Sequence, residues 1–167
     1  MIKNIPQIEV SDALIQKGQE TLNSLLPRES ATKFADLSLL SLIWPYKITN
    51  NSQTKQVLEN VQYHLLRKRG VIRYKNDKYY NKNQDGFSEE AEWTFGLSWL
   101  SIIYALLHNK KKSEYFLKKA METVTKKGEI PELYFSNTDQ HNKNTPLGWS
   151  ESLFIVALYK INKKAKN

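Results

Sequence analysis

The chain has 167 residues, of which 40% are hydrophobic, and it carries a formal net charge of +8. This length suits one domain with a buried core, so we expect residues 1–167 to form a single domain. The chain contains no cysteine, which excludes disulfides and thiolate metal sites and favours a reducing compartment. It has neither an apolar run of the roughly 20 residues that span a bilayer nor the apolar stretch of a secretory signal. We therefore expect a soluble, cytoplasmic protein.

Apolar residues follow a helical spacing almost everywhere, which predicts about six helices and no confident strand. In chain order, the expected helices cover 11–26, 31–44, 52–70, 89–108, 113–128 and 148–160. Pro27 and Pro45 follow the first two helices, and Ser52 and Gly70 suit the two ends of the third.

The helices expected at 89–108 and 148–160 are apolar around most of their circumference, whereas the one at 113–128 has lysines on its outer face. Such an alternation indicates two layers, with the apolar helices inside. A helical barrel or toroid fits this pattern, and so does a plain helical bundle. The barrel is favoured because the unusual residues lie in the two long loops that lead into the apolar helices.

These two loops are rich in carboxylates, tyrosines and tryptophans. Their polar and aromatic residues are Arg73, Tyr74, Asp77, Tyr79, Tyr80, Glu89, Glu90, Glu92, Trp93, Glu132, Tyr134 and Trp149. Aromatic rings stack on the apolar faces of sugars, charged groups pair with hydroxyls, and glycosidic hydrolysis needs two carboxyl groups. The composition therefore points to a carbohydrate site.

Motifs for other chemistries are missing from the sequence. It contains no nucleophile elbow, phosphate-binding glycine loop or zinc motif, and His64, His108 and His141 lie far apart. We therefore expect neither a metal nor a cofactor. The lysines spread over helix faces and the C-terminal tail are typical of a solvated surface, and a basic helical adaptor for nucleic acid remains the least favoured alternative.

Four motifs occur in a fixed order: R-Y-x-x-D-x-Y-Y from Arg73, E-A-E-W from Glu90, G-x-I-P-E-x-Y from Gly128, and T-P-L-G-W-S-x-S-L from Thr145. This order resembles the C-terminal half of glycoside hydrolase family 15, the glucoamylases. E-A-E-W and P-E-L-Y are even more similar to the glucoamylase-like domain of phosphorylase kinase alpha and beta subunits and their bacterial relatives. The resemblance implies an all-α fold, a partial (α/α)6 barrel that makes up about half of a six-hairpin toroid.

The resemblance also implies roles for individual residues. Glu132, in the P-E-x-Y motif, would be the general base that activates water for inversion at the anomeric carbon. The implied substrate-binding residues are Arg73, Tyr74, Asp77, Trp93, Tyr134 and Trp149. For Arg73 with Asp77 the alternative is an ion pair that stabilises the loop, and for Trp93 and Trp149 it is the core. For Glu132 the alternative is a helix cap or a surface residue.

Two departures from the family pattern bear on activity. The residue after the base is commonly Gln in glucoamylases, whereas here it is Leu133. The general acid of the family lies in the N-terminal half of the barrel, so we expect it to be missing from this chain. Glu89, Glu90 and Glu92 are poor substitutes, because a helix N-terminus would keep Glu92 ionised.

The expected function is the C-terminal part of an inverting hydrolase of α-glucans or malto-oligosaccharides. A non-catalytic glycan-binding or regulatory domain of the phosphorylase-kinase type is the main alternative. A half toroid has an exposed apolar flank, so we expect it to associate with an N-terminal half-barrel or with a second copy.

Overall fold

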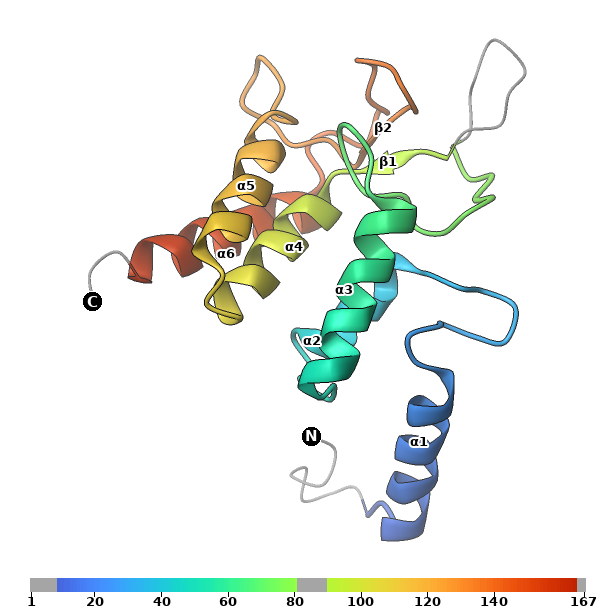
Figure 1. Ribbon diagram of the computed structural model, residues 1–167. Coiled ribbons are helices and arrows are strands. Elements are labelled where there is room, and N and C mark those ends of the chain that lie inside the picture. The colour runs from blue at the N-terminus through green and yellow to red at the C-terminus, as the bar shows by residue number, and fades with distance from the viewer. Residues whose placement is uncertain (1–8, 81–89, 165–167) are drawn as a thin grey trace.

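The computed structural model describes residues 9–80 and 90–164. It is mostly helical, as expected (Figure 1). The helices are α1 (Asp12–Leu25), the 3-10 helix η2 (Leu37–Leu39), α2 (Leu40–Ile43), α3 (Asn51–Leu65), α4 (Phe95–Leu106), α5 (Lys110–Met121) and α6 (Gly148–Lys164). The strands are β1 (Glu92–Trp93) and β2 (Leu133–Tyr134). No helix within the described ranges is both long and apolar enough to cross a membrane.

The expectation of no strand is wrong at one place. β1 pairs antiparallel with β2, with Glu92 opposite Tyr134 and Trp93 opposite Leu133, and Val71 bridges to Trp93 on the other side. Because this pairing takes up the backbone around residue 92, α4 begins at Phe95 rather than near residue 89.

Only the second half of the helix expected at 31–44 is helical. Helical structure begins only at Leu37, where the side chain of Asp36 accepts a hydrogen bond from the N–H of Ser38 at 2.8 Å. The N–H of Leu37 donates to the carbonyl of Arg73 at 2.7 Å, so this segment is tied to a loop far along the chain. That long-range bond has no local signal in the sequence.

The third helix begins one residue early and ends well before Gly70. Asn50 and Gln53 form its capping box, and the chain becomes extended at Leu66, which bridges to Val71. Gly70 has a different role, since a Cβ built there would lie 2.6 Å from the backbone carbon of Glu92. It permits close approach of two backbones rather than ending a helix.

The fifth helix is also shifted toward the N-terminus. Asn109, not Ser113, is its N-cap, because the Asn109 side chain accepts from the N–H of Lys112 at 3.1 Å. Ser113 is buried instead, and its hydroxyl donates to the carbonyl of Ser101 in α4 at 2.9 Å. Gly128, expected to end the helix, lies beyond it in a turn at φ 82°.

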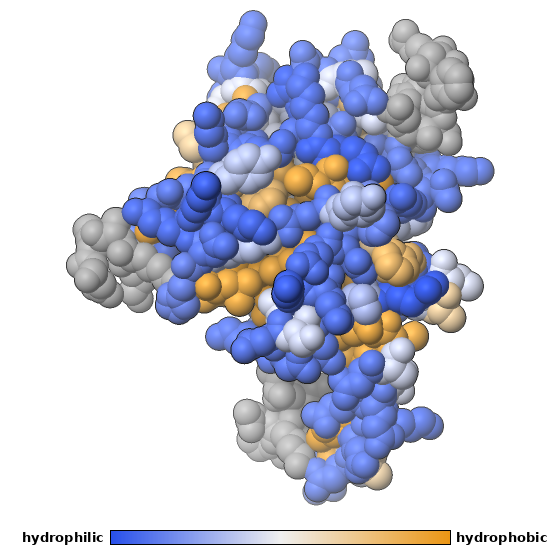
Figure 2. Space-filling view, in the orientation of Figure 1, coloured by the Kyte–Doolittle hydropathy of each residue, from blue (hydrophilic) through white to orange (hydrophobic). Residues whose placement is uncertain are grey.

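The core is built around α4, whose residues from Phe95 to Ala105 are all buried. It packs against both α5 and α6, as its nearly all-apolar sequence predicts for an inner helix. On α6 the apolar residues are divided, with Leu153 and Ala157 in the core while Ile155 and Tyr159 are 62% and 57% exposed. Apolar surface also remains visible in the middle of the molecule (Figure 2).

The two loops singled out in the sequence lie at one end of the helices, at the top of Figure 1. Val71 pairs with Trp93, Trp93 pairs with Leu133, and the side chain of Asn144 reaches the hydroxyl of Tyr80. The two loops therefore converge, over the described residues of the range 70–88 and over 128–147. α1 lies at the opposite end of the molecule.

Candidate functional site

Glu132 lies where β2, α4 and α6 meet. The N–H of Thr94 donates to the carbonyl of Glu132 at 3.2 Å, and the hydroxyls of Thr94 and Ser150 donate to the carbonyl of Pro131 at 2.5 Å and 3.2 Å. Thr94 precedes α4, and Ser150 lies in the first turn of α6. These bonds therefore fix Pro131 and Glu132 against the two inner helices. Glu132 does not cap a helix.

The Glu132 carboxylate is half-buried and held by two amides. The side-chain N–H groups of Asn142 and Asn144 donate to Oε2 of Glu132 at 2.5 Å and 2.7 Å. Among the described residues, no donor reaches Oε1. The arrangement leaves one carboxylate oxygen able to accept a proton from a water molecule.

Asp77 forms a bidentate ion pair with Arg73. Nε of Arg73 donates to Oδ2 at 2.6 Å, Nη2 donates to Oδ1 at 2.8 Å, and the N–H of Tyr79 donates to Oδ1 at 3.1 Å. Asp77 is 2% exposed and both its oxygens accept hydrogen bonds within the protein, so these contacts match the alternative of an ion pair that stabilises the loop. A sugar-binding role for Asp77 stays a prediction.

Both ionisations are shifted by this pairing. Burial alone would raise the pKa of Asp77, but the hydrogen bonds from Arg73 and from the Tyr79 amide, with the Arg73 charge, bring it below its usual value. The hydrogen bond to Asp77 raises the pKa of Arg73. The pair is therefore charged at neutral pH.

Aromatic rings surround the Arg73 guanidinium. Its central carbon lies 4.6 Å from the ring centroid of Trp93, 5.0 Å from that of Tyr79 and 5.8 Å from that of Tyr74. The rings of Tyr79 and Trp93 are nearly parallel, at 14°. Trp93 is buried, so it supports Arg73 rather than forming an exposed wall of a pocket, while Tyr74 is half-buried and Tyr79 is exposed.

This group of rings is continuous with the surroundings of Glu132. The rings of Tyr79 and Tyr80 contact edge to face at 4.5 Å, and Asn144 donates from Nδ2 to the hydroxyl of Tyr80 at 3.4 Å. The hydrogen bond with Tyr80 raises the pKa of Tyr79, and the charge of Glu132 adds to this effect. Arg73 and Glu132 thus belong to one surface, joined through Tyr79, Tyr80 and Asn144.

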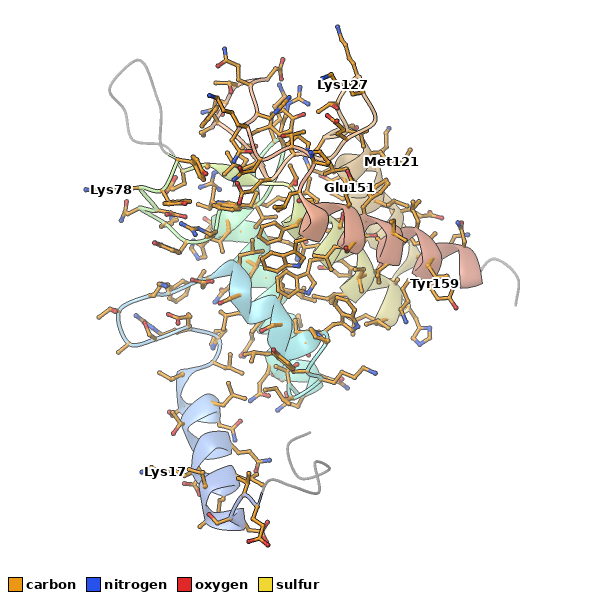
Figure 3. The ribbon with its side chains drawn as sticks, turned by 180° about the vertical axis from the view of Figure 1, so that it is seen from behind. Lys17, Lys78, Met121, Lys127, Glu151 and Tyr159 are labelled. Carbon is orange, nitrogen blue, oxygen red and sulfur yellow. The ribbon has the colours of Figure 1, made fainter. Side chains whose placement is uncertain are left out.

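Trp149 is an exposed aromatic platform at the start of α6. Its indole stacks on Phe95 with centroids 4.3 Å apart and planes at 15°, yet Trp149 remains 53% exposed. The next residue, Ser150, is bonded to the carbonyl of Pro131. Glu151, which is labelled in Figure 3, also ties the segment before Glu132 to α6. Its Oε1 accepts a hydrogen bond from the N–H of Ile130 at 2.7 Å.

Tyr134, expected among the sugar-binding residues, lies inside the protein. It is buried, and its hydroxyl donates to the carbonyl of Thr123 at 2.9 Å, while the Arg69 guanidinium lies 5.0 Å from its ring centroid. Burial raises the pKa of Tyr134. These contacts tie Tyr134 to the loop at Thr123, and its sugar-binding role stays a prediction.

Glu92 was expected at the N-terminus of a helix. It lies instead in β1 and is 1% exposed. Its two carboxylate oxygens accept from the backbone N–H groups of Arg69 at 2.5 Å and of Asn137 at 3.3 Å. With both oxygens bonded to backbone N–H groups and the side chain buried, the carboxylate is closed off from a substrate. Glu90 accepts from the N–H of Asn76 at 2.7 Å, and Glu89 lies outside the described residues.

Sequence reasoning missed Asn142 and Asn144. Neither belongs to one of the four motifs, and asparagine is a common loop residue with no distinctive chemistry. The one available signal was their spacing of two positions within a loop already suspected of function. Their convergence on Glu132 depends on the turn that folds this loop back along β2.

No protein-family profile matches the chain. Comparisons with individual proteins and with solved structures do find similar proteins. The chain is 28% identical over 191 aligned positions to the phosphorylase b kinase regulatory subunit alpha, skeletal muscle isoform, of Oryctolagus cuniculus. This match covers 93% of the chain and 15% of that subunit.

Solved structures give a similar result. A wild-type glycosidase superposes with a TM-score of 0.71 at 14% identity, and a glycosidase variant in complex with glucose gives the same values. Each match covers 96% of this chain and 46% of the glycosidase, so the chain spans about half the length of these relatives. The similarity shows a shared fold.

Proposed function

We propose that the chain is part of a glucoamylase-like domain, with the all-α fold of part of an (α/α)6 barrel, and that it binds α-glucans and activates water for their hydrolysis. The substrate class in this proposal is the malto-oligosaccharide. The observation that carries the proposal is the state of Glu132: half-buried, held through Oε2, with Oε1 unbound within the described part of the chain. A carboxylate held in this way suits a general base.

In the proposed reaction Glu132 accepts a proton from water. The water oxygen forms a bond to the anomeric carbon as the glycosidic bond to the leaving oxygen breaks, which inverts the configuration. An acid roughly 6.5–9.5 Å from the base must protonate the leaving oxygen. We assign that acid to the remainder of the fold, which corresponds to the 54% of the solved glycosidases that this chain does not cover.

Sugar recognition is assigned to the exposed groups around Glu132. Trp149 and Tyr79 offer rings on which the apolar face of a glucose unit can stack. Arg73, fixed by Asp77 and one-third exposed, offers N–H groups to hydroxyls. We place the substrate between these two sides, over the carboxylate of Glu132.

A second candidate function is regulatory binding of glycans without turnover. The similarity to a kinase regulatory subunit favours it, because that relative aligns with 93% of the chain. Turnover distinguishes the two candidates. A longer assembly that contains the acid would hydrolyse maltotetraose under the first proposal, and would bind it unchanged under the second.

The apolar residues on α6 are proposed to be a protein interface. Ile155 and Tyr159 point away from the core, and Tyr159 lies on the outer side of α6 in Figure 3. The remaining half of a barrel is the partner that we favour, since the solved glycosidases contain about as much fold again. A concentration-dependent dimer in sedimentation experiments would indicate a second copy instead.

Binding of a cationic sugar analogue tests the assignment of Glu132. A basic iminosugar resembles the positive charge of the transition state, whereas maltose is neutral. We expect Glu132→Gln to weaken iminosugar binding at least about tenfold while maltose affinity stays within about twofold, measured by calorimetry. Equal losses for both ligands would contradict the base assignment, and the absence of maltose binding in the unmodified chain would contradict the sugar site.

A further inference from the structure

Asn142 and Asn144 approach Glu132 from the same loop and bind the same oxygen. Their Nδ2 atoms lie 2.5 Å and 2.7 Å from Oε2. We propose that these two asparagines are positioning residues that aim Oε1 of Glu132 at the reacting water, an inference that rests on the proposed function. We call the pair the amide clamp.

The amide clamp is not needed to fix the path of its loop. Backbone bonds already do so, since the N–H of Glu132 donates to the carbonyl of Asn144 at 3.0 Å and the N–H of Asn142 donates to the carbonyl of Leu133 at 3.2 Å. The two side-chain bonds are additional, and both end on a charged acceptor, where hydrogen bonds are strongest. Their effect falls on the carboxylate rather than on the backbone.

The buried Oδ1 atom of Asn142 gives independent support. Asn142 is buried, and its Oδ1 has no hydrogen-bond partner among the described residues. An unpaired buried acceptor is unfavourable, so its position needs a compensating contact. The bond to Glu132 therefore orients the Asn142 amide, and its Oδ1 atom is left without a hydrogen-bond partner among the described residues.

Asn144 extends the clamp to the opposite loop. Its Nδ2 also donates to the hydroxyl of Tyr80 at 3.4 Å, which joins the carboxylate to the aromatic side of the site. Leu133 cannot supply such an amide, because it is an aliphatic residue that lies fully buried in the core. The loop 142–144 therefore contributes the only amides that reach the Glu132 carboxylate within the described ranges.

Two donors on one oxygen have a geometric consequence. With Oε2 fixed, rotation of the carboxylate is blocked, and Oε1 is left as the oxygen that can accept a proton. General bases act over heavy-atom distances of roughly 2.6–3.2 Å, so a carboxylate free to turn loses much of its effect. The clamp should therefore matter for recognition of the transition-state charge and little for binding of a neutral sugar.

The first experiment tests the clamp without any sugar. In NMR spectra of the full chain, the side-chain amide signals of Asn142 and Asn144 should shift strongly when Glu132 is replaced by leucine. The signals of Asn109, which caps α5, should not move. Unchanged Asn142 and Asn144 signals in the variant would overturn the clamp whether or not the chain binds glycans.

The second experiment measures selectivity, defined as iminosugar affinity divided by maltose affinity, for Asn144→Leu, Asn144→Gln and Lys143→Ala. Loss of the Asn144 amide should lower selectivity about threefold to tenfold with maltose affinity unchanged, and Gln should restore part of it. The exposed Lys143 lies between the two asparagines, so its variant controls for disturbance of the loop. If Glu132→Gln loses selectivity but Asn144→Leu does not, the positioning role is overturned while the proposed function stands.

Discussion

Arg73 donates two hydrogen bonds to the buried carboxylate of Asp77, from Nε at 2.6 Å and from Nη2 at 2.8 Å. Asp77 therefore acts on the candidate site through Arg73, which it holds among the rings of Tyr79 and Trp93. A sugar hydroxyl would meet the guanidinium and not the carboxylate. This relationship makes a prediction about stability as well as about binding.

Stability should depend on pH through Asp77. The folded-state pKa of Asp77 lies below its usual value, so its contribution is present above the unfolded value of about 3.9 and is lost as pH falls through the folded pKa. Asp77→Asn should lower the free energy of unfolding by about 1–3 kcal/mol at pH 7 and by much less near pH 2. Urea denaturation at several pH values measures the difference.

Asp139→Asn is the matched control for that experiment. Hydrogen bonding to Arg69 also lowers the pKa of Asp139, but its side chain is exposed to solvent. An exposed pair of this kind contributes little to stability, so we expect a small effect with weak pH dependence. Equal behaviour of the two variants would contradict the structural role assigned to Asp77.

Glu92→Gln should destabilise the fold without altering ligand selectivity. The carboxylate accepts from the backbone N–H groups of Arg69 and Asn137, and a glutamine must turn its NH₂ group toward one of these donors. The cost of one such buried mismatch is about 1–3 kcal/mol. Thermal or urea denaturation provides the measurement, with the half-buried Glu90→Gln as control. A change in iminosugar selectivity caused by Glu92→Gln would return Glu92 to the list of candidate acids.

Prediction from sequence succeeded where local patterns decide the outcome. The apolar run around Leu100 marks an inner helix because no polar face exists to meet water, and α4 is buried as expected. This inference needed only neighbours along the chain. The role of Glu132, in contrast, is implied by the resemblance that the four motifs carry, and it stays a prediction.

The errors arise where distant segments pair. β1 forms because Trp93 pairs with Leu133 on one side and with Val71 on the other. No pattern near residue 93 in the sequence predicts these pairings. The resemblance implies sugar-binding roles for Asp77 and Tyr134. Their burial depends on Arg73 and Thr123 reaching them in the folded chain, and no local pattern predicts it.

Gly70→Ala should be strongly destabilising. A Cβ at Gly70 would lie 2.6 Å from the backbone carbon of Glu92 and 2.7 Å from the backbone nitrogen of Trp93, so β1 would have to move. We expect a loss of about 2 kcal/mol or more in urea denaturation. Gly18→Ala is the control, since its site within α1 is open and alanine should add roughly 1 kcal/mol of helix stability. A neutral Gly70→Ala would show that the β1 approach is looser than described.

Trp149→Ala should weaken the binding of maltose and of the iminosugar alike. Trp149 stacks on Phe95 but remains 53% exposed, so its loss should cost the fold little and the ligand a stacking surface. A stacked ring contributes about 1–1.5 kcal/mol, which corresponds to a loss of about tenfold in affinity for both ligands. A ring contributes to the ground state and the transition state equally, so both ligands should be affected. This pattern differs from that of Glu132→Gln, which should affect the charged ligand alone.

Tyr159→Ala is the matched control. Tyr159 is an exposed aromatic residue on the same helix but on its outer side (Figure 3), and its loss should leave both affinities unchanged. If Tyr159→Ala weakened maltose binding as much as Trp149→Ala, the sugar would lie on the outer flank of α6 and not over Glu132.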